Sequence, residues 1–600
     1  MADQPIRLAN FSGYFGDRFT AVDEVLAGDP VDVLVGDYLA EITLAALAAR
    51  HPADPERGYV EYFVDQLRPH LASLADRGIR VVTNAGGFNP AGLAAVLRDE
   101  LTAAGVGLRV AHIEGDNIAS RLTELQQQGH RLENLDTGQP LSEWPVPPIA
   151  ANAYLGGWGI ARALGEGADI VVCGRVTDAS LTVGPAAWWH GWEPGDWDRL
   201  AGAVLAGHII ECGPQAVGGN FSGFTSVEHL LTPGFPIAEI AADGSSVITK
   251  HSGDDGAVTV DTVTAQLVYE IQGPRYLNPD VTVHLDDVRL TAAGRDRVRV
   301  DRVTGSPPPP TTKVAIFGQI GYQQVNTVYV TAPDITGKVE LLRRQLERVT
   351  PEGVRLRLTT LGTAATDPET QWDATVAVRI LATATDREAL ARLQLARVLG
   401  SLYLQSYPGY FTDVAGTQQV KPGPRIEYWP GLLELAAVAH RVVLDERVLE
   451  IAAPERTAAP EVLTHPEPTE IIATEPARRV PLGTVAHARS GDKGGNCNAG
   501  IWTPYPAVWP WLRAFLSTEE IRRLVPEVKD LDIVRHEFPE LRAVHFVFRG
   551  LLGTGGSAND RVDTGAVPHG LGAARIRPGR MVAGVRPNVL CRNGSYCEDR

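Results

Sequence analysis

Acidic side chains recur where short apolar runs of the chain give way to polar or Gly-rich loops. GDYLAE places Asp37 and Glu41 four residues apart, and EGDN places Glu114 and Asp116 in one turn. Two carboxyl groups can divide the general-acid and general-base roles when their surroundings separate their pKa values. Any one Asp or Asn in such a loop is more commonly a helix cap. The recurrence of such polar side chains in five loops instead favours a site for proton transfer.

The segment GRVTDAS adds a cation to these carboxyl groups. Arg175 could hold a substrate carboxylate or phosphate through its guanidinium, or it could form an internal ion pair with Asp178. The candidate catalytic residues are Asp37, Glu114, Asp116, Arg175 and Asp178. The candidate substrate-binding residues in this half of the chain are Asp17, Tyr38, Asn84, Gly86, Gly87, Asn152 and Asn220.

Three Gly-rich segments, NAGGFNP, AYLGGWG and AVGGNF, could bring backbone N–H groups close to a phosphate or carboxylate. Tight turns are an equally good explanation. The chain lacks the G-x-G-x-x-G dinucleotide fingerprint and the P-loop fingerprint in these segments, so we predict no required cofactor. A divalent metal, or CoA as the carrier of the substrate, stays open.

The segment HIIECGPQ places His208, Glu211 and Cys212 close together. A Cys–His nucleophile or a metal site is conceivable, but the spacing H-x-x-E-C matches no strong metal signature. A small buried thiol is the more common structure for such a cysteine.

A second dense segment, HARSGDKGGNCN, contains three further candidate substrate-binding residues, His487, Asp492 and Lys493. SGDKGGN could form an anion-binding nest in which Lys493 supplies a point charge. It could equally be a latch that docks one domain onto the sheet edge of another.

The elements that must position these groups read as alternating strands and helices. Apolar runs at Ile6–Asn10, Val31–Val35, Ile79–Thr83, Leu108–Ile113 and Asp169–Cys173 predict five strands with helices between them. Strands buried on both faces predict a parallel sheet, which binds ligands beyond the carboxyl ends of its strands. The polar loops should therefore meet at one edge. The helix that begins near residue 60 contains Pro69 and should be kinked or split there. We also expect helices near 91–104 and 153–164.

The rest of the chain differs in texture. Residues 232–331 read as β-rich, AVTVDTVTAQLVYEI included, and residues 339–349 and 387–404 read as helical. We predict an α/β domain over 1–451, with a parallel core over about 1–230 and a β-rich continuation over about 231–451. A Pro/Glu linker (452–479), a small α+β domain (480–590) and a tail (591–600) follow.

Composition narrows the classes of function. The 600 residues have a net charge of −17, which argues against nucleic acid and anionic membranes as partners. No apolar run reaches the length of a membrane span, no secretory signal is visible, and the five Cys show no disulfide framework. We therefore expect a cytoplasmic protein. Tryptophans that look exposed, at 188, 189, 192, 509 and 511, suggest a homo-oligomer.

Seven segments occur in an order that resembles the acyclic terpene utilisation AtuA family. They are NFSGYFGDRFTA, DVLVGDYLAEIT, VVTNAGGFNP, NAYLGGW, DIVVCGRVTDAS, IECGPQAVGGNF and HARSGDKGGNCNAGIW. The resemblance covers about residues 6–440 and 480–588. It implies a large AtuA-type domain followed by a small AtuA-like domain of ferredoxin fold. It also implies a link to the breakdown of branched acyl-CoA esters, and it transfers no catalytic residue.

These observations favour an enzyme that acts on a small anionic substrate, a carboxylate or a branched acyl-CoA thioester. We expect a hydratase or dehydratase in which Glu114, Asp37 or Asp116 transfers protons and Arg175 or Lys493 holds the anion. One alternative is a hydrolase of an ester, thioester or lactone that uses Cys212 or an activated water. Another is a non-catalytic ligand-binding or assembly subunit of a catabolic complex.

Overall fold

The computed structural model describes residues 4–50, 55–413, 421–463, 465–468 and 481–562. The predicted tail and the end of the small domain, beyond residue 562, lie outside the described residues, as does most of the second half of the predicted linker.

All five predicted strands form, and they lie side by side in one parallel sheet. Their order is β1 (Ile6–Ser12), β2 (Val33–Gly36), β3 (Arg80–Thr83), β6 (Ile170–Val172) and β4 (Val110–Glu114). The carboxyl ends of all five strands therefore point to the same edge. The α/β class predicted from the sequence is confirmed.

Antiparallel strands extend this sheet on both sides to eleven strands. Beyond β1 lie β7 (Pro236–Ile240), β8 (Ser246–Lys250), β12 (Val298–Asp301) and β11 (Arg289–Ala292). Beyond β4 lie β19 (Arg441–Leu444) and β20 (Arg447–Glu450). Much of the β-rich continuation thus completes the sheet of the first half.

Helices cover both faces of the sheet, as the apolar strands require. Along β2 the side chains alternate: Leu34 faces one core, and Val33 and Val35 face the other. The Leu34 side packs on α1 (Ala21–Ala27), α2 (Glu41–Arg50), α3 (Glu61–Leu67), α4 (Leu71–Arg77) and α5 (Pro90–Ala104). The other side packs on α7 (Trp158–Gly165), α8 (Ser180–His190) and α9 (Trp197–Ile210).

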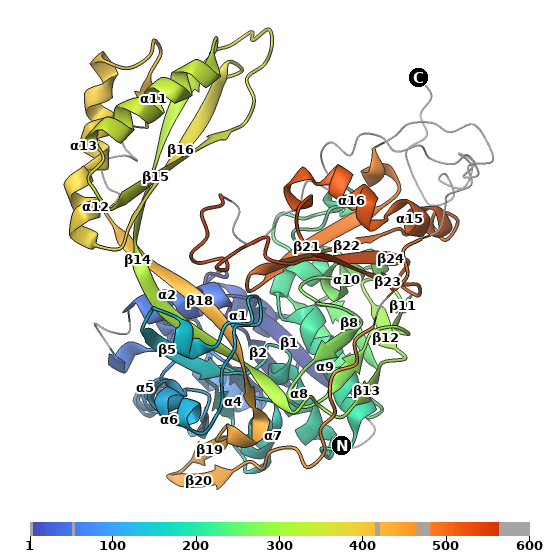
Figure 1. The fold of residues 1–600 in the computed structure, drawn as a ribbon. Helices are drawn as coiled ribbons and strands as arrows, with labels where there is room; N and C mark the ends of the chain where they lie inside the picture. The colour runs from blue at the N-terminus through green and yellow to red at the C-terminus, as the bar shows by residue number, and fades with distance from the viewer. Residues whose placement is uncertain (1–3, 51–54, 414–420, 464, 469–480, 563–600) are drawn as a thin grey trace.

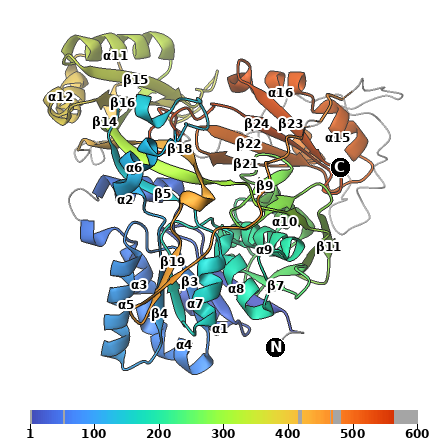
Figure 2. The ribbon, with the colours of Figure 1, turned by 60° about the horizontal axis from the view of Figure 1, so that its bottom comes forward.

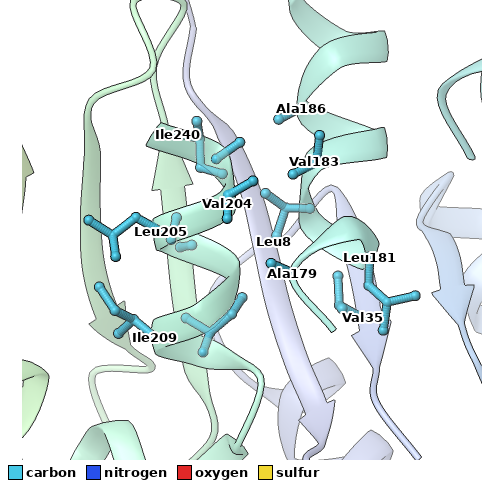
Figure 3. Close-up of a cluster of buried hydrophobic side chains, with 14 of the residues drawn as sticks. Leu8, Val35, Ala179, Leu181, Val183, Ala186, Val204, Leu205, Ile209 and Ile240 are labelled. Atoms are coloured by element: carbon cyan, nitrogen blue, oxygen red, sulfur yellow. The ribbon is translucent and has the colours of Figure 1, made fainter. Parts of the chain in front are cut away.

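Figure 3 shows this second core, where Val204 of α9 lies beside Leu8 of β1. The predicted break at Pro69 is present, because a 3-10 turn over Arg68–His70 separates α3 from α4. The helix expected over 153–164 is shorter, since β5 (Pro148–Ala153) and a turn precede α7.

One segment read as strand is a helix. α10 spans Val260–Leu267 inside the predicted β-rich region. Its alternating valines and threonines fit a strand, but Thr259 and Thr262 form a reciprocal capping box that starts a helix. The two threonine hydroxyls accept from backbone N–H groups at the start of the helix, which have no partner within the helix itself.

A long strand builds a projecting arm (Figure 1). β14 (Thr311–Thr331) pairs with β18 (Gly423–Glu434) and β5 near its start and with β16 (Thr375–Ala384) near its end. The arm also holds β15 (Val354–Leu361), α11 (Ile335–Val349), α12 (Arg387–Leu393) and α13 (Leu395–Ser401). The helices expected over 339–349 and 387–404 are confirmed, the second as two helices and a 3-10 turn (Leu402–Leu404).

The C-terminal unit has its own antiparallel sheet, in the order β21 (His487–Lys493), β22 (Asn496–Trp502), β24 (Ala543–Phe548) and β23 (Ile533–Phe538). α15 (Trp509–Phe515) and α16 (Thr518–Leu524) connect β22 to β23. The sheet packs against α10 (Figure 2), where the side-chain amide of Asn498 donates to the Val268 carbonyl at 2.8 Å. The α+β class expected here is confirmed.

Two expectations about surfaces can be compared with this fold. The expectation that five tryptophans are exposed is wrong. Trp188, Trp189 and Trp192 pack on the main core, and Trp509 and Trp511 pack on the C-terminal core. A homo-oligomer therefore stays a prediction without that support. Within the described residues, no helix combines the length and apolar composition needed to span a bilayer.

Candidate functional site

A cavity of about 420 Å³ opens at the carboxyl edge of the parallel sheet. The loops after β1, β2 and β6 contribute to its wall, together with the turn after α9, the residues after α10, and the tip of β21. Seven of the residues predicted from the sequence line it: Asp17, Asp37, Arg175, Asp178, Asn220, Asp492 and Lys493. Segments up to 476 residues apart in the chain thus meet at one hollow, counted from Asp17 to Lys493.

Arg175 and Asp178 form the central ion pair of this wall. The Arg175 Nη1 atom lies 2.6 Å from an Asp178 carboxylate oxygen and donates to the Leu39 carbonyl at 2.7 Å. The guanidinium carbon also lies 4.1 Å from the centre of the Tyr154 ring. Burial alone would raise the pKa of Asp178, but the charges of Arg175 and Lys493 lower it below the ordinary value. Asp178 is therefore an ionised carboxylate.

Asp37 has the opposite character. It is buried in the loop after β2 and accepts from the Asn84 side-chain amide at 2.7 Å and from the Leu39 N–H at 3.2 Å. Burial, and then the negative charge of Asp178, raise its pKa well above the ordinary value. Arg175 opposes this only in part. Asp37 therefore holds its proton more tightly than an ordinary aspartate does.

Two lysines neutralise two more carboxylates. Lys313 of β14 lies 2.7 Å from Glu41, and Lys493 lies 2.7 Å from Glu270. Burial opposes the ionised form of Glu41, but the charge of Lys313 lowers its pKa. The ammonium of Lys313 also lies 5.3 Å and 5.4 Å from the ring centres of Tyr154 and Tyr428.

Asp492, like Asp37, has no ion-pair partner of its own among the described residues. Burial, followed by the nearby charges of Glu270 and Glu41, raises its pKa to about 8. Lys493 opposes this rise but is already bound to Glu270. The cavity thus contains carboxyl groups in both protonation states at neutral pH.

The β21–β22 hairpin docks onto the first domain through its tip. The N–H of Gly494 donates to Glu41 at 3.2 Å, and the N–H of Gly495 donates to Asp136 at 3.0 Å. The Asn496 amide adds a bond of 2.8 Å to the same aspartate. Gly494 has φ +63°, which favours glycine at this turn. The two functions considered for SGDKGGN coincide here, because the anions that its N–H groups bind are carboxylates of the first domain.

The carboxyl groups after β4 lie elsewhere. Asp116 is buried and accepts from the Asn152 amide at 2.7 Å and from the Arg175 N–H at 2.6 Å. Burial raises its pKa to about 6. Glu114 lies 3.0 Å from the His112 ring, at a position where β4 pairs with β19. Asp116 and Asn152 thus support the backbone behind Arg175, and Glu114 lies at the side of the sheet.

The remaining predicted residues support the cavity wall or its edge. The Tyr38 hydroxyl donates to Gln66 at 2.6 Å within the core, and Asn84 accepts from the Tyr38 N–H at 2.7 Å. The N–H of Gly86 donates to the Cys173 carbonyl at 3.0 Å, and that of Gly87 to the Asn84 carbonyl. His487 packs between the rings of Phe221 and Trp502 at the interface of the two domains.

Comparison with known families agrees with this architecture. The sequence profile described as acyclic terpene utilisation family protein AtuA matches residues 6–444, and the AtuA ferredoxin-like domain matches residues 480–570. The chain belongs to the AtuA family. The resemblance noted from its seven segments is thereby confirmed for both parts of the chain.

Other comparisons add little to the AtuA assignment. No curated protein matches the chain. A solved structure of S. aureus homoserine dehydrogenase at pH 6.5 is 12% identical, with a TM-score of 0.12, over 67% of this chain and 83% of that chain. A TM-score this low supports no statement about either fold or activity.

The H-x-x-E-C segment of this AtuA chain also borders the cavity. The His208 ring lies 3.2 Å from Glu211, and both are buried. Burial, followed by the charges of Glu211 and Glu270, raises the pKa of Cys212 well above the ordinary value. The thiol is therefore protonated, which weakens it as a nucleophile. Across the described ranges, no group of three or more His, Cys, Asp or Glu side chains is arranged to hold a metal ion.

Sequence reasoning missed two charged residues of the site, Lys313 and Glu270. Lys313 lies in a strand far from the predicted rim, and nothing in TTKVAIF marks it as functional. Glu270 follows α10, which was read as strand, and has the unusual φ of +56°. The sequence does not show this backbone strain, so it contains no signal that marks Glu270 as part of the site.

Proposed function

We propose that the cavity is the active site of a lyase that adds water to, or removes it from, an activated double bond. The substrate would be a small carboxylate or its CoA thioester. The observation that supports this proposal is the separation of pKa values within one cavity: lowered for Asp178, raised for Asp37 and Asp492. Hydration and dehydration require an acid and a base side by side at the same pH.

The roles follow from the protonation states. In dehydration Asp178, as the carboxylate, would take the proton from the substrate carbon, and Asp37, as a neutral acid, would give its proton to the hydroxyl group, which leaves as water; hydration reverses both transfers. Asp492, as the second neutral acid, would donate a hydrogen bond to the carbonyl oxygen on which negative charge develops. A carboxyl group kept neutral by its surroundings is a known type of oxyanion donor. Arg175 would keep Asp178 ionised through the cycle, because its guanidinium stays charged.

The charge of the cavity restricts the substrate. Its wall contains seven carboxyl groups, Asp17, Asp37, Glu41, Asp178, Glu211, Glu270 and Asp492, against the two cations Arg175 and Lys493. Asp37 and Asp492 are neutral in this proposal and Lys313 neutralises Glu41, which leaves four carboxylates against the two cations, so a free dicarboxylate would meet net repulsion. A thioester presents a neutral carbonyl to the reacting groups and carries its phosphates elsewhere, so it suits this wall better.

Two variants test the assignment. Asp178→Asn removes the base, and Asp492→Asn replaces a neutral acid with an amide that does not ionise. We expect Asp178→Asn to lower turnover of enoyl-CoA esters by about 10²–10⁴-fold, the range found for removal of a general base. Because the Asn amide still donates a hydrogen bond, Asp492→Asn should lower turnover by less than Asp178→Asn does. The decrease in rate that we expect near pH 8, where Asp492 ionises, should be absent in the Asp492→Asn protein.

The matched control is Glu352→Gln, in the exposed loop before β15 of the projecting arm. The assay measures hydration as the loss of enoyl absorbance for each member of a panel of acyl-CoA esters and unsaturated acids. Turnover of the Asp178→Asn protein equal to that of the Glu352→Gln protein would remove Asp178 as the base. If the unmodified protein changes no ester in the panel, the lyase proposal itself is rejected.

A further inference from the structure

A second cavity, of about 330 Å³, adjoins the first. The two cavities share three wall residues: Asp178, Glu270 and Lys493. The Lys493–Glu270 ion pair, with its bond of 2.7 Å, is therefore part of the partition between them. Both side chains retain some exposure, 26% for the lysine and 17% for the glutamate. A lysine side chain has many rotamers, so this partition can rearrange when a ligand enters.

The walls of the second cavity differ from those of the first. Three leucines from distant segments line it: Leu135 in the loop after α6 (Leu122–Gln127), Leu277 in β9 (Arg275–Leu277) and Leu432 in β18. Their exposures are 49%, 46% and 40%, high values for leucine side chains. Four prolines (279, 309, 430 and 460) and the rings of Tyr154 and Tyr276 complete the apolar part of the wall.

This grouping needs an explanation that core packing does not provide. Single exposed leucines are ordinary on a protein surface, but apolar side chains that converge on one hollow are typical of a ligand site. Several polar groups on the same wall are on the shared partition or paired. Arg275, for example, lies 2.9 Å from Glu461 and also binds Asp286.

We propose that the second cavity binds an apolar chain of the substrate, while its reacting head occupies the first. The ligand class is an acyl compound whose chain runs past the Lys493–Glu270 pair. This inference rests on the proposed function for the identity of the head only, because chain binding in the second cavity requires no turnover. The β21–β22 hairpin then contributes to both halves of the site, since Lys493 belongs to each wall.

The test measures binding by calorimetry. The probes are straight-chain 3-hydroxyalkanoates of four, six, eight and ten carbons, offered to the full chain. We expect affinity to rise at least tenfold from the four-carbon to the ten-carbon probe, because each added methylene leaves water for an apolar wall. Leu432→Trp should fill the cavity and remove most of that rise, while the affinity for the four-carbon probe changes less than twofold.

Leu277→Trp is the second variant, so that a misfolded protein in one case does not end the test. Leu404→Trp is the matched control, because this leucine is 98% exposed on the projecting arm. A chain-length dependence that both cavity variants retain would overturn the proposal, as would the same affinity for all four probes or no binding of any probe. Loss of turnover in Asp178→Asn with an intact chain-length dependence would leave the chain site standing, and chain binding without any turnover would reject only the lyase.

Discussion

The loops after β2 and β4 lie at the same edge of one parallel sheet, with β3 and β6 between the two strands, and each loop carries a buried aspartate in different surroundings. After β4, Asp116 accepts two short hydrogen bonds from buried donors and faces the backbone behind the site. After β2, Asp37 lies on the wall of the cavity. Burial raises the pKa of both.

The difference lies in what surrounds each carboxyl group. The first cause of the Asp37 shift after burial is another charge, that of Asp178, whereas around Asp116 the further contributions are hydrogen bonds that lower its pKa. A carboxyl group that is stabilised by fixed donors contributes to the fold. One that is held neutral beside an ionised neighbour, in a cavity, can exchange a proton.

The largest effect should come from Asp37→Asn. Its side chain keeps an oxygen for the Asn84 amide but loses the proton that we assign to it. We expect turnover to fall by about 10²–10⁴-fold. The free energy of unfolding at pH 8 should not fall, because the neutral amide avoids the cost of ionising a buried carboxyl group. Kinetics and urea unfolding on the same sample check both, and a stable protein with full activity would contradict the contrast.

Asp116→Ala should give the reverse result. It leaves the Asn152 amide and the Arg175 N–H without their acceptor in a buried place, which we expect to cost roughly 2–3 kcal/mol of stability. Asp116→Asn is the matched control, because it retains an acceptor oxygen and should cost less. The measurement is urea unfolding at pH 7, and equal losses for the two variants would show that the acceptor oxygen is not what matters.

The sequence predicts that these carboxyl groups lie at one edge of the sheet, but it does not predict which of them face the cavity. Five strands and their polar loops follow from the apolar runs, and the common edge follows from parallel pairing. Whether a side chain such as Glu114 turns into the cavity or along the sheet depends on the partner strand. Here that partner is β19, more than 300 residues away in the chain. Long-range pairing of this kind leaves no local signal.

The same limit explains the partners of the predicted groups. The sequence identifies Lys493 as a candidate binding residue but not its partner Glu270. Glu270 reaches Lys493 because α10 precedes it, and the alternation of Val and Thr in α10 predicts a strand unless the threonine capping box is recognised. The docking of the small domain was one of two readings of SGDKGGN. Its outcome depends on Asp136, in the loop after α6, and on Glu41, the first residue of α2.

A smaller and more specific effect concerns pH. The pKa of Asp492 is raised from 3.8 to about 8, so the folded protein holds a proton that the unfolded chain releases. Protonated Asp492 adds to the free energy of unfolding. This added stability is fully present below about pH 4 and is lost as the pH rises toward 8. Asp492→Asn should remove it, so the decline in unfolding free energy should be shallower by up to about 1.4 kcal/mol per pH unit. Parallel slopes for the two proteins between pH 5 and 8 would contradict the raised pKa.

The smallest effect should come from Glu114→Gln, in the loop region that the sequence ranked beside Asp37. Its carboxylate lies 3.0 Å from the His112 ring, and its side chain is 37% exposed. Burial lowers the pKa of His112, so its ring is neutral and the contact is a hydrogen bond rather than an ion pair. With the carboxylate this exposed, we expect a loss of less than about 1 kcal/mol of stability. Turnover should change less than twofold, because the residue lies along β19 rather than on the cavity wall. A loss of activity as large as that of Asp37→Asn would instead mean that the loop after β4 reaches the reacting groups, and the distinction between the two loops would fail.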